Sequence, residues 1–144
     1  MKDQELFEKI KGAGLRLTGP RRALLAILSE SQKPLSAKGL LAALAQAAVV
    51  VNKTTVYREI ESLEKIGVLR SIQLGERSTY YELATRDHHH HLVCLECAEV
   101  EDVDVNEESI VKQERKIVAE HRFQVTHHAL EFFGLCVRCQ KAAC

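Results

Sequence analysis

The chain has 144 residues, of which 46% are hydrophobic and 28% are charged, as is typical of a soluble globular protein and not of disordered, collagen-like or membrane proteins. Its longest apolar stretch, residues 40–51, contains Gln46 and is shorter than the roughly 20 residues that span a bilayer. Charged residues close to Met1 argue against a secretory signal, so we expect a cytoplasmic protein without a membrane partner.

The formal net charge of zero hides an uneven distribution. Residues 1–80 carry thirteen Lys and Arg against eight Asp and Glu, a net charge of +5, whereas residues 81–144 carry seven against twelve, a net charge of −5. A basic half suits a polyanion, and an acidic half rich in histidine and cysteine suits cations. The split predicts two small domains with different partners, and each is small enough to need a structural metal or an oligomer interface.

Four helices are expected in the basic half. Leu6, Phe7 and Ile10 have helical spacing, and glycines close that segment. The other three helices each follow a residue that can cap a helix start, namely Thr18, Ser36 and Asn52. Their apolar stripes are Leu24, Leu25, Ile27 and Leu28, then Leu40, Leu41 and Leu44 within residues 37–47, then Val56, Ile60, Leu63 and Ile66. The last two helices, joined by a short turn, predict a helix-turn-helix.

Two β-prone runs, residues 68–74 and 78–83, surround Gly75 and predict a hairpin, which after a helix-turn-helix forms the wing of a winged-helix domain. The helix after Asn52 begins with hydrogen-bond donors and a cation, as a recognition helix does where it meets base edges and phosphates. These residues are Thr54, Thr55, Tyr57 and Arg58. Further cations that could hold the DNA backbone are Arg21, Arg22, Lys33 and Lys38. The alternative is that the two threonines only complete a capped helix start and that the tyrosine is a half-buried packing residue.

Cysteines dominate the acidic half as two C-x-x-C pairs, Cys94 with Cys97 and Cys136 with Cys139. Four thiolates in two tight pairs match a tetrahedral structural zinc site. The 38 intervening residues, 98–135, must contain a folded element, and helical spacing over 107–121 supplies one. A thioredoxin-like redox pair or free buried thiols are disfavoured because two pairs occur and no βαβ pattern surrounds them. The fifth cysteine, Cys144, is expected to be a spare exposed thiol.

Four consecutive histidines, residues 88–91, precede the first cysteine pair. If they are extended and lead into a strand, His88 and His90 point to one face and His89 and His91 to the other, so one tetrapeptide can serve two sites. Imidazole and carboxylate ligands together suit Fe(II), Mn(II) or Zn(II). The partners available are Glu82, Asp102, Glu107, Glu108 and, on a strand expected over 123–133, His127 and His128. The alternative is a solvated turn that binds metal adventitiously, and His121 is expected to be an exposed helix-end residue.

Several segments together carry a family resemblance over nearly the whole chain. They are Arg16-Leu17-Thr18-Gly19-Pro20-Arg21, Thr55-Val56-Tyr57-Arg58, His88 through His91 with Leu92-Val93-Cys94-Leu95-Glu96-Cys97, His127-His128-Ala129-Leu130-Glu131, and Gly134-Leu135-Cys136-Val137-Arg138-Cys139. In this order they resemble the ferric uptake regulator (Fur) family of metal-responsive repressors. The resemblance implies an α+β chain with a winged helix-turn-helix domain over 1–83, a hinge over 84–87, and a small α/β dimerisation domain over 88–144 whose strands pair across a homodimer.

The resemblance also implies ligand sets and DNA contacts. The structural zinc site is then Cys94, Cys97, Cys136 and Cys139. The regulatory site between the domains is Glu82, His89, His91 and Asp102. A site inside the dimerisation domain consists of His88, His90 and His128 with an acidic residue of the following helix. Tyr57 and Arg58 enter the major groove, and Arg16 matches a basic position directed toward the minor groove.

Two positions depart from the family pattern. Residues 32–35 are Gln-Lys-Pro-Leu, where family members commonly have a histidine that completes the regulatory site, and no histidine precedes His88. Counting back from His128 places Val111 where the family has its helix glutamate. Glu108 and Glu107 are the available substitutes, and we prefer Glu108.

The expected function is repression of transcription by a homodimer that binds double-stranded operator DNA when a divalent metal fills the His/carboxylate sites. Structural Zn(II) holds the cysteines. The sensed ion is expected to be Fe(II) or Mn(II), with Zn(II) possible, because no cysteine is left near the histidines. The alternatives are a zinc-uptake or peroxide-responsive member of the family, and a constitutive DNA-binding module with purely structural metals. A zinc hydrolase or deaminase is disfavoured because the strings H-x-E and P-C-x-x-C are both absent.

Overall fold

The computed structural model describes residues 2–75 and 78–142, so the prediction for Cys144 lies outside the described residues. The chain divides into two compact units after Asp87, and each is described by itself. The boundary falls at the end of residues 84–87, and the hinge there stays a prediction. Among the described residues, none of the helices is long and apolar enough to cross a bilayer.

The described residues of the first unit form four helices, and the three predicted caps are confirmed. The helices are α1 (Lys2–Gly12), α2 (Gly19–Glu30), α3 (Ala37–Gln46) and α4 (Lys53–Lys65). The side chain of Thr18 accepts from the backbone N–H of Arg21, that of Ser36 from Gly39, and that of Asn52 from Thr55 at 2.8 Å. Each cap satisfies a backbone donor that has no partner inside its helix, which is why these helices begin where they do.

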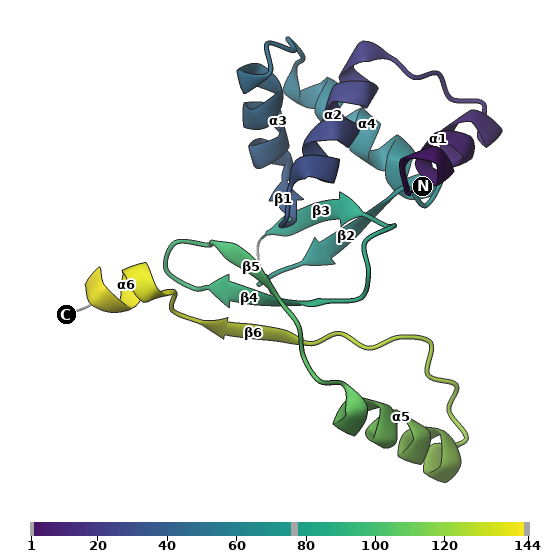
Figure 1. The fold of residues 1–144 in the computed structure, drawn as a ribbon, viewed down its shortest axis with the longest axis vertical. Coiled ribbons are helices and arrows are strands. Elements are labelled where there is room, and N and C mark those ends of the chain that lie inside the picture. Colours follow the sequence, from purple (N-terminus) through teal and green to yellow (C-terminus); the bar gives the residue numbers. More distant parts are fainter. Residues whose placement is uncertain (1, 76–77, 143–144) are drawn as a thin grey trace. The chain divides into compact units, whose positions relative to one another are not determined.

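Besides the helices, the described residues of this unit form a three-stranded antiparallel sheet. Its strands are β1 (Leu35–Ser36), β2 (Leu69–Gln73) and β3 (Thr79–Leu83), in the order β1-β3-β2. The chain turns from α4 into β2 at Gly67, whose φ of +71° is easily reached only without a side chain. The hairpin β2–β3 is the predicted wing, and Figure 1 shows the helices of this unit stacked on one side of it. β1 was not expected, because two residues are too short for a periodic pattern.

The core of the first unit lies between the helices and the hairpin. Its buried side chains are Leu6, Ile10, Leu24, Leu25, Leu28, Leu40, Leu44, Val56, Ile60, Leu63, Val68, Leu69 and Leu83. The predicted stripes therefore face inward, with Ile27, Leu41 and Ile66 only partly buried against them. Phe7 differs, since 44% of its surface is exposed.

Over residues 88–142, the second unit is a smaller three-stranded sheet with two helices. Its elements are β4 (His90–Cys94), β5 (Val100–Val103), α5 (Glu108–His121), β6 (Glu131–Gly134) and α6 (Val137–Ala142). β4 is central, antiparallel to β5 and parallel to β6. The predicted strand over 123–133 is wrong except at its end, because pairing with β4 starts only at Glu131, opposite His91. α6 was not predicted, since six residues carry little periodicity.

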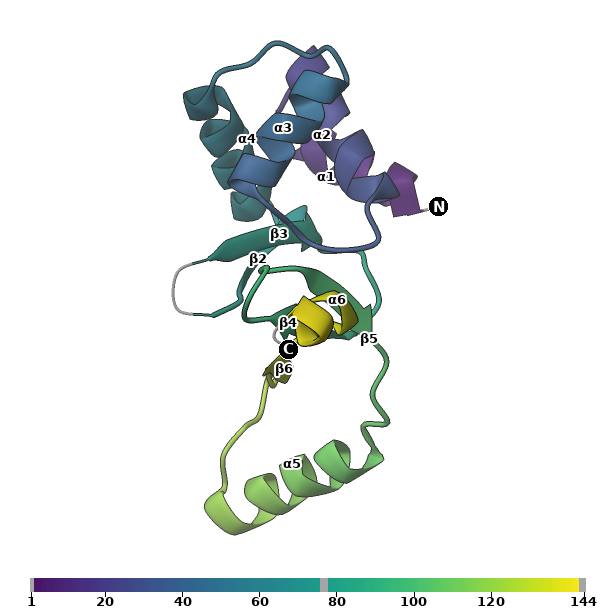
Figure 2. The same cartoon turned by 90° about the vertical axis from the view of Figure 1, so that its left-hand side faces the viewer.

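Within this unit, α5 stands apart from the sheet, joined to it by extended segments at both ends (Figure 2). No residue of α5 is buried, and the helix exposes Val111, Ile117 and Val118. The overall class is nevertheless as expected: an α+β chain in which a winged helix-turn-helix precedes a smaller α/β unit.

Candidate metal centres and nucleic-acid interface

The four paired cysteines come together at one end of the second sheet. Their Sγ atoms all lie within 4.8 Å of one another, and those of Cys97 and Cys136 are 3.8 Å apart. Four sulfurs at the usual Zn–S distance of about 2.3 Å in a tetrahedron would be about 3.8 Å apart. The end of β4 supplies Cys94 and the turn after it supplies Cys97, while Cys136 immediately precedes α6 and Cys139 lies within that helix. The sulfur geometry therefore fits a closed tetrathiolate site.

Backbone and side-chain groups around the sulfurs favour negative charge. The backbone N–H of Cys136 donates to Cys94 Sγ at 3.4 Å and is the main cause that lowers the pKa of the Cys94 thiol to about 6. The hydrogen bond with Cys136 raises the pKa of Cys139 to about 12, as expected where thiols share a proton. Arg138 lies inside the second C-x-x-C pair, and no role was predicted for it. Its Nη2 atom lies 3.9 Å from Cys97 Sγ and 2.8 Å from Glu99 Oε2. Its charge partly offsets that of a tetrathiolate.

A second cluster is built from nitrogen and oxygen donors. His88, His90, Glu107 and His128 each offer one ligand atom, all within 4.8 Å of one another. The three imidazole Nε2 atoms converge on Glu107 Oε1, at 2.6 Å from His88, in direct contact from His90, and at 3.5 Å from His128. Hydrogen bonding from His90 is the main cause that lowers the pKa of Glu107. Three imidazoles and a carboxylate around one point are a donor set for a divalent transition metal.

The acidic member of this cluster is Glu107 and not the preferred Glu108. Glu108 is the first residue of α5, its side chain is 72% exposed, and it pairs with Lys112 at 3.3 Å. Glu107 immediately precedes the helix and is held by His88 and His90. The sequence could not separate two adjacent acids, since only the direction in which α5 leaves the sheet decides which one faces the histidines.

A third group lies on the opposite face of the histidine run. The Nε2 atoms of His89 and His91 are 3.1 Å apart, and they lie 3.8 and 3.7 Å from Asp102 Oδ1, whose residue pairs with His91 across β4 and β5. The alternation expected of an extended chain therefore separates the four histidines into two pairs. His127 and His121 join neither cluster, since His127 contacts Thr126 and His121 is exposed at the end of α5.

The fourth residue assigned to that regulatory site, Glu82, belongs to the first unit. Both of its carboxylate oxygens are engaged there by arginines. Arg70 Nε donates to Oε1 at 2.6 Å, and Arg86 Nη1 donates to Oε2 at 2.8 Å. The same Arg86 side chain also donates to the carbonyl of Gln32, in the segment where the family histidine is missing.

The predicted DNA-contacting residues lie on the surface of the first unit. Arg16, Thr54, Tyr57 and Arg58 are exposed, and Thr55 is half-buried beside its cap. Tyr57 is 45% exposed, and Lys53 Nζ lies 5.8 Å from the centre of its ring. The start of α4 therefore presents cations and hydroxyls together.

The expectation that Arg21 holds DNA phosphates is wrong. Its side chain is 9% exposed and forms a fork with Glu59, with Nε 2.7 Å from Oε2 and Nη2 3.2 Å from Oε1. Nη1 donates to the carbonyl of Arg16 at 2.5 Å. Arg21 thus links α2, α4 and the segment before α2, and it is not available to DNA.

The comparisons with known proteins agree on one family. Residues 12–133 match the model of the ferric uptake regulator family. The ferric uptake regulation protein of Legionella pneumophila is 37% identical over 138 residues, covering 94% of this chain and 99% of that protein. That of Neisseria gonorrhoeae is 32% identical over 133 residues, covering 92% and 91%. The chain belongs to the ferric uptake regulator family. The resemblance found in the sequence is confirmed.

Solved structures of Fur proteins share the fold. The Vibrio cholerae ferric uptake regulator has a TM-score of 0.78 at 31% identity, over 88% of this chain and 96% of that one. The Pseudomonas aeruginosa regulator, solved with manganese, has a TM-score of 0.69 at 28% identity, over 90% and 96%. Members of the Fur family are metal-responsive transcriptional regulators, so this chain is a regulator of transcription and not an enzyme.

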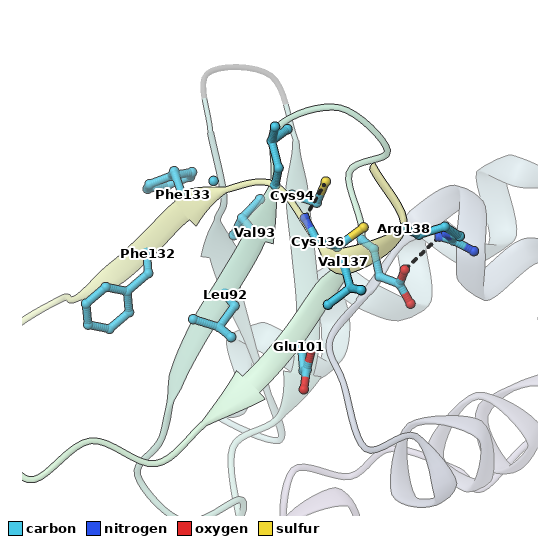
Figure 3. Close-up of a pocket in the computed structure, with 12 residues that line it drawn as sticks. Leu92, Val93, Cys94, Glu101, Phe132, Phe133, Cys136, Val137 and Arg138 are labelled. Carbon is cyan, nitrogen blue, oxygen red and sulfur yellow. Dashed lines mark hydrogen bonds and ion pairs between the residues drawn. The ribbon is translucent and has the colours of Figure 1, made fainter. Parts of the chain in front are cut away.

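A shallow hollow of about 430 Å³ lies on the sheet of the second unit of this Fur-family chain. Figure 3 shows Leu92 and Val93 of β4 beside Phe132 and Phe133 of β6, with Val137 beyond them. Leu92, Phe132, Phe133 and Val137 are all exposed. Contiguous exposed apolar side chains of this kind indicate a protein interface.

Proposed function

We propose that this Fur-family regulator is a repressor that binds operator DNA as a homodimer when Fe(II) or Mn(II) occupies its His/carboxylate sites. A structural Zn(II) would be held by Cys94, Cys97, Cys136 and Cys139. The observation that carries the proposal is the separation of two donor chemistries. One cluster contains only sulfur, and the other contains three converging imidazole Nε2 atoms and Glu107.

The sulfur cluster supports a permanent structural role. Four thiolates fill all four positions of a tetrahedral zinc ion, so that no position stays open for water or substrate. The site joins β4 to the segment that leads into α6, and these lie far apart in sequence. A small unit with little core gains most from such a cross-link.

The nitrogen and oxygen clusters support exchangeable sensing. His88, His90, His128 and Glu107 offer borderline and hard donors without sulfur, which suits Fe(II) and Mn(II) at least as well as Zn(II). The Pseudomonas aeruginosa regulator, a relative of similar fold, was solved with manganese. A second regulatory site is proposed at Glu82, His89, His91 and Asp102.

The second site would supply the coupling between metal and DNA. Glu82 belongs to the DNA-binding unit, and the other three ligands belong to the second unit. Metal shifts the equilibrium only if it binds the DNA-competent arrangement more tightly, and a coupling of roughly 1–3 kcal/mol would change the affinity for DNA about 5- to 150-fold.

The homodimer is supported by the apolar surface of the second unit. The sheet exposes Leu92, Phe132 and Phe133, and α5 exposes Val111 and Ile117. A lone unit of this size would not keep so many large apolar side chains in water. A two-fold dimer would bury them and would place two recognition helices at a defined spacing for two half-sites, in the cytoplasm where operator DNA lies.

On DNA, α4 would enter the major groove, with Tyr57 and Arg58 toward base edges and Thr54 and Thr55 near the backbone. Arg16 would reach the adjacent minor groove. The surface exposure of Arg16, Thr54, Tyr57 and Arg58 supports this arrangement over the alternative in which Tyr57 only packs against the core.

The test is DNA binding measured against metal. The zinc-loaded dimer is used to select its operator from random duplexes in the presence of Mn(II). Binding to that operator is then titrated with Fe(II), Mn(II) and Zn(II). Affinity should rise with Fe(II) or Mn(II) and stay low in their absence. His89→Ala with His91→Ala should remove the response while zinc stays at the cysteines.

A constitutive DNA-binding module is the rival function, and a specific observation favours it. Arg70 and Arg86 already hold Glu82, and no histidine exists at residues 32–35 to help a metal bridge the units. Equal operator affinity with and without Fe(II), Mn(II) and Zn(II), at constant zinc in the tetrathiolate, would establish this rival.

A further inference from the structure

We propose that Glu114 is a positioning residue of the cluster formed by His88, His90, Glu107 and His128. Its carboxylate accepts a hydrogen bond from the Nδ1–H of His128. The Nε2 atom of that ring then keeps its lone pair and can bind the metal. The inference deepens the proposed function and rests on it. Glu114 belongs to none of the ligand sets expected from the sequence.

The contact fixes which nitrogen of His128 carries the proton. His128 Nδ1 lies 2.8 Å from Glu114 Oε1. A carboxylate only accepts hydrogen bonds, so Nδ1 must be the donor, and in the neutral ring Nε2 then keeps its lone pair. A ligating histidine is commonly oriented in this way, with the other nitrogen donating to a carboxylate or a carbonyl.

The lone pair faces the centre of the cluster. His128 Nε2 is buried and forms no hydrogen bond within residues 2–75 and 78–142, and Glu107 Oε1 is 3.5 Å away. Burying an imidazole nitrogen that forms no hydrogen bond costs free energy, unless the nitrogen has another partner such as a metal ion. A metal ion bound by His88, His90 and Glu107 would supply that ligand.

His90 repeats the arrangement with a different acceptor. Its Nδ1 lies 3.1 Å from the carbonyl oxygen of Leu130, so its Nε2 also faces Glu107. Both anchors act on residues 122–130, which have no regular secondary structure. Glu114 ties this segment to α5, and Leu130 ties it to the start of β4. Without Glu114, the side chain of His128 would lose its anchor to the helix.

The position of Glu114 explains how the site forms although Val111 replaces the expected helix glutamate. Residues three apart on a helix share a face, so Glu114 lies one turn beyond Val111 on the same side of α5. From there its carboxylate reaches the outer nitrogen of His128, while Glu107 reaches the inner one. Two acids, one before α5 and one within it, thus face the two ring nitrogens of a single histidine.

The experiment uses the full chain with zinc in the tetrathiolate and with His89→Ala and His91→Ala, so that one exchangeable site is left. This double variant is the parent, and Glu114→Ala and Glu114→Gln are introduced into it. Glu120→Ala serves as a matched control, because Glu120 is an exposed acid of α5 paired only with Lys116 among the contacts described. The probe is Co(II), followed by its d–d absorption. Absence of sulfur-to-cobalt bands shows that zinc keeps the cysteines. The His128 tautomer is read in the metal-free site from two-bond ¹H–¹⁵N couplings.

Glu114→Ala should lower the Co(II) affinity about 10- to 100-fold and shift His128 away from the Nδ1–H tautomer. Glu114→Gln keeps an acceptor and should retain the tautomer with a smaller loss, and Glu120→Ala should match the parent. A merely structural role would not move the tautomer in a folded protein.

Glu114→Ala with an unchanged tautomer and a Co(II) affinity within about twofold of the parent would overturn the inference and leave the proposed function intact. No binding of Co(II) or Mn(II) by the parent would overturn the proposed sensing at this cluster, and the inference with it.

Discussion

Arg21→Met tests whether the inward-facing arginine of α2 holds the DNA-binding unit together. The fork between Arg21 and Glu59 is well removed from solvent, with side-chain exposures of 9% and 16%. Methionine retains most of the aliphatic volume but removes the charge and three hydrogen bonds, including the one to the carbonyl of Arg16. Glu59 is then left as a carboxylate with no cation in a largely buried position.

The expected loss is about 3 kcal/mol of unfolding free energy for the first unit, near the lower end of the range for breaking a buried pair because Glu59 keeps some contact with water. For a unit of this size the loss corresponds to a fall in Tm of roughly 12–24 °C. In the double variant Arg21→Met/Glu59→Leu no charge is left buried, so most of the loss should be recovered.

Tyrosine fluorescence during urea unfolding measures this loss specifically. The chain has no tryptophan, and its three tyrosines, residues 57, 80 and 81, all lie in the first unit. Arg22→Met is the matched control, because Arg22 is the next residue of the same helix and is exposed. It should change stability by no more than about 0.5 kcal/mol. A loss below about 1 kcal/mol for Arg21→Met, or no recovery in the double variant, would refute the reasoning.

Three further predictions test other parts of the molecule. Leu40→Ala empties a fully buried core position and should cost about 3 kcal/mol in the same urea assay, and a loss below about 1 kcal/mol would place Leu40 outside the core. Cys136→Ser should reduce the zinc bound per chain, measured by elemental analysis, and destabilise the second unit, whereas retained zinc would argue against the tetrathiolate. Arg86→Gln removes a cation that competes with metal for Glu82. The Mn(II) affinity of the proposed Glu82 site, measured by calorimetry, should therefore rise by about three- to tenfold. An unchanged affinity would show that Glu82 is not a ligand there.

Local signals in the sequence were sufficient for much of this protein. The caps at Thr18, Ser36 and Asn52 act within four residues, so they can be read without knowing what the helices pack against. The cysteine pairs and the alternation along residues 88–91 are equally local. Side-chain direction along an extended chain follows from its period of two, which separates the histidines before any fold is known.

Only the tertiary structure decided which partners these groups meet. Arg21 and Arg22 look alike in the sequence, yet one turns inward to Glu59, 38 residues away, and the other stays at the surface. Likewise, the choice of Glu107 over Glu108 and the use of Glu114 depend on the course of α5 relative to the sheet. Such contacts join residues distant along the chain, and periodicity carries no information about where two distant segments meet.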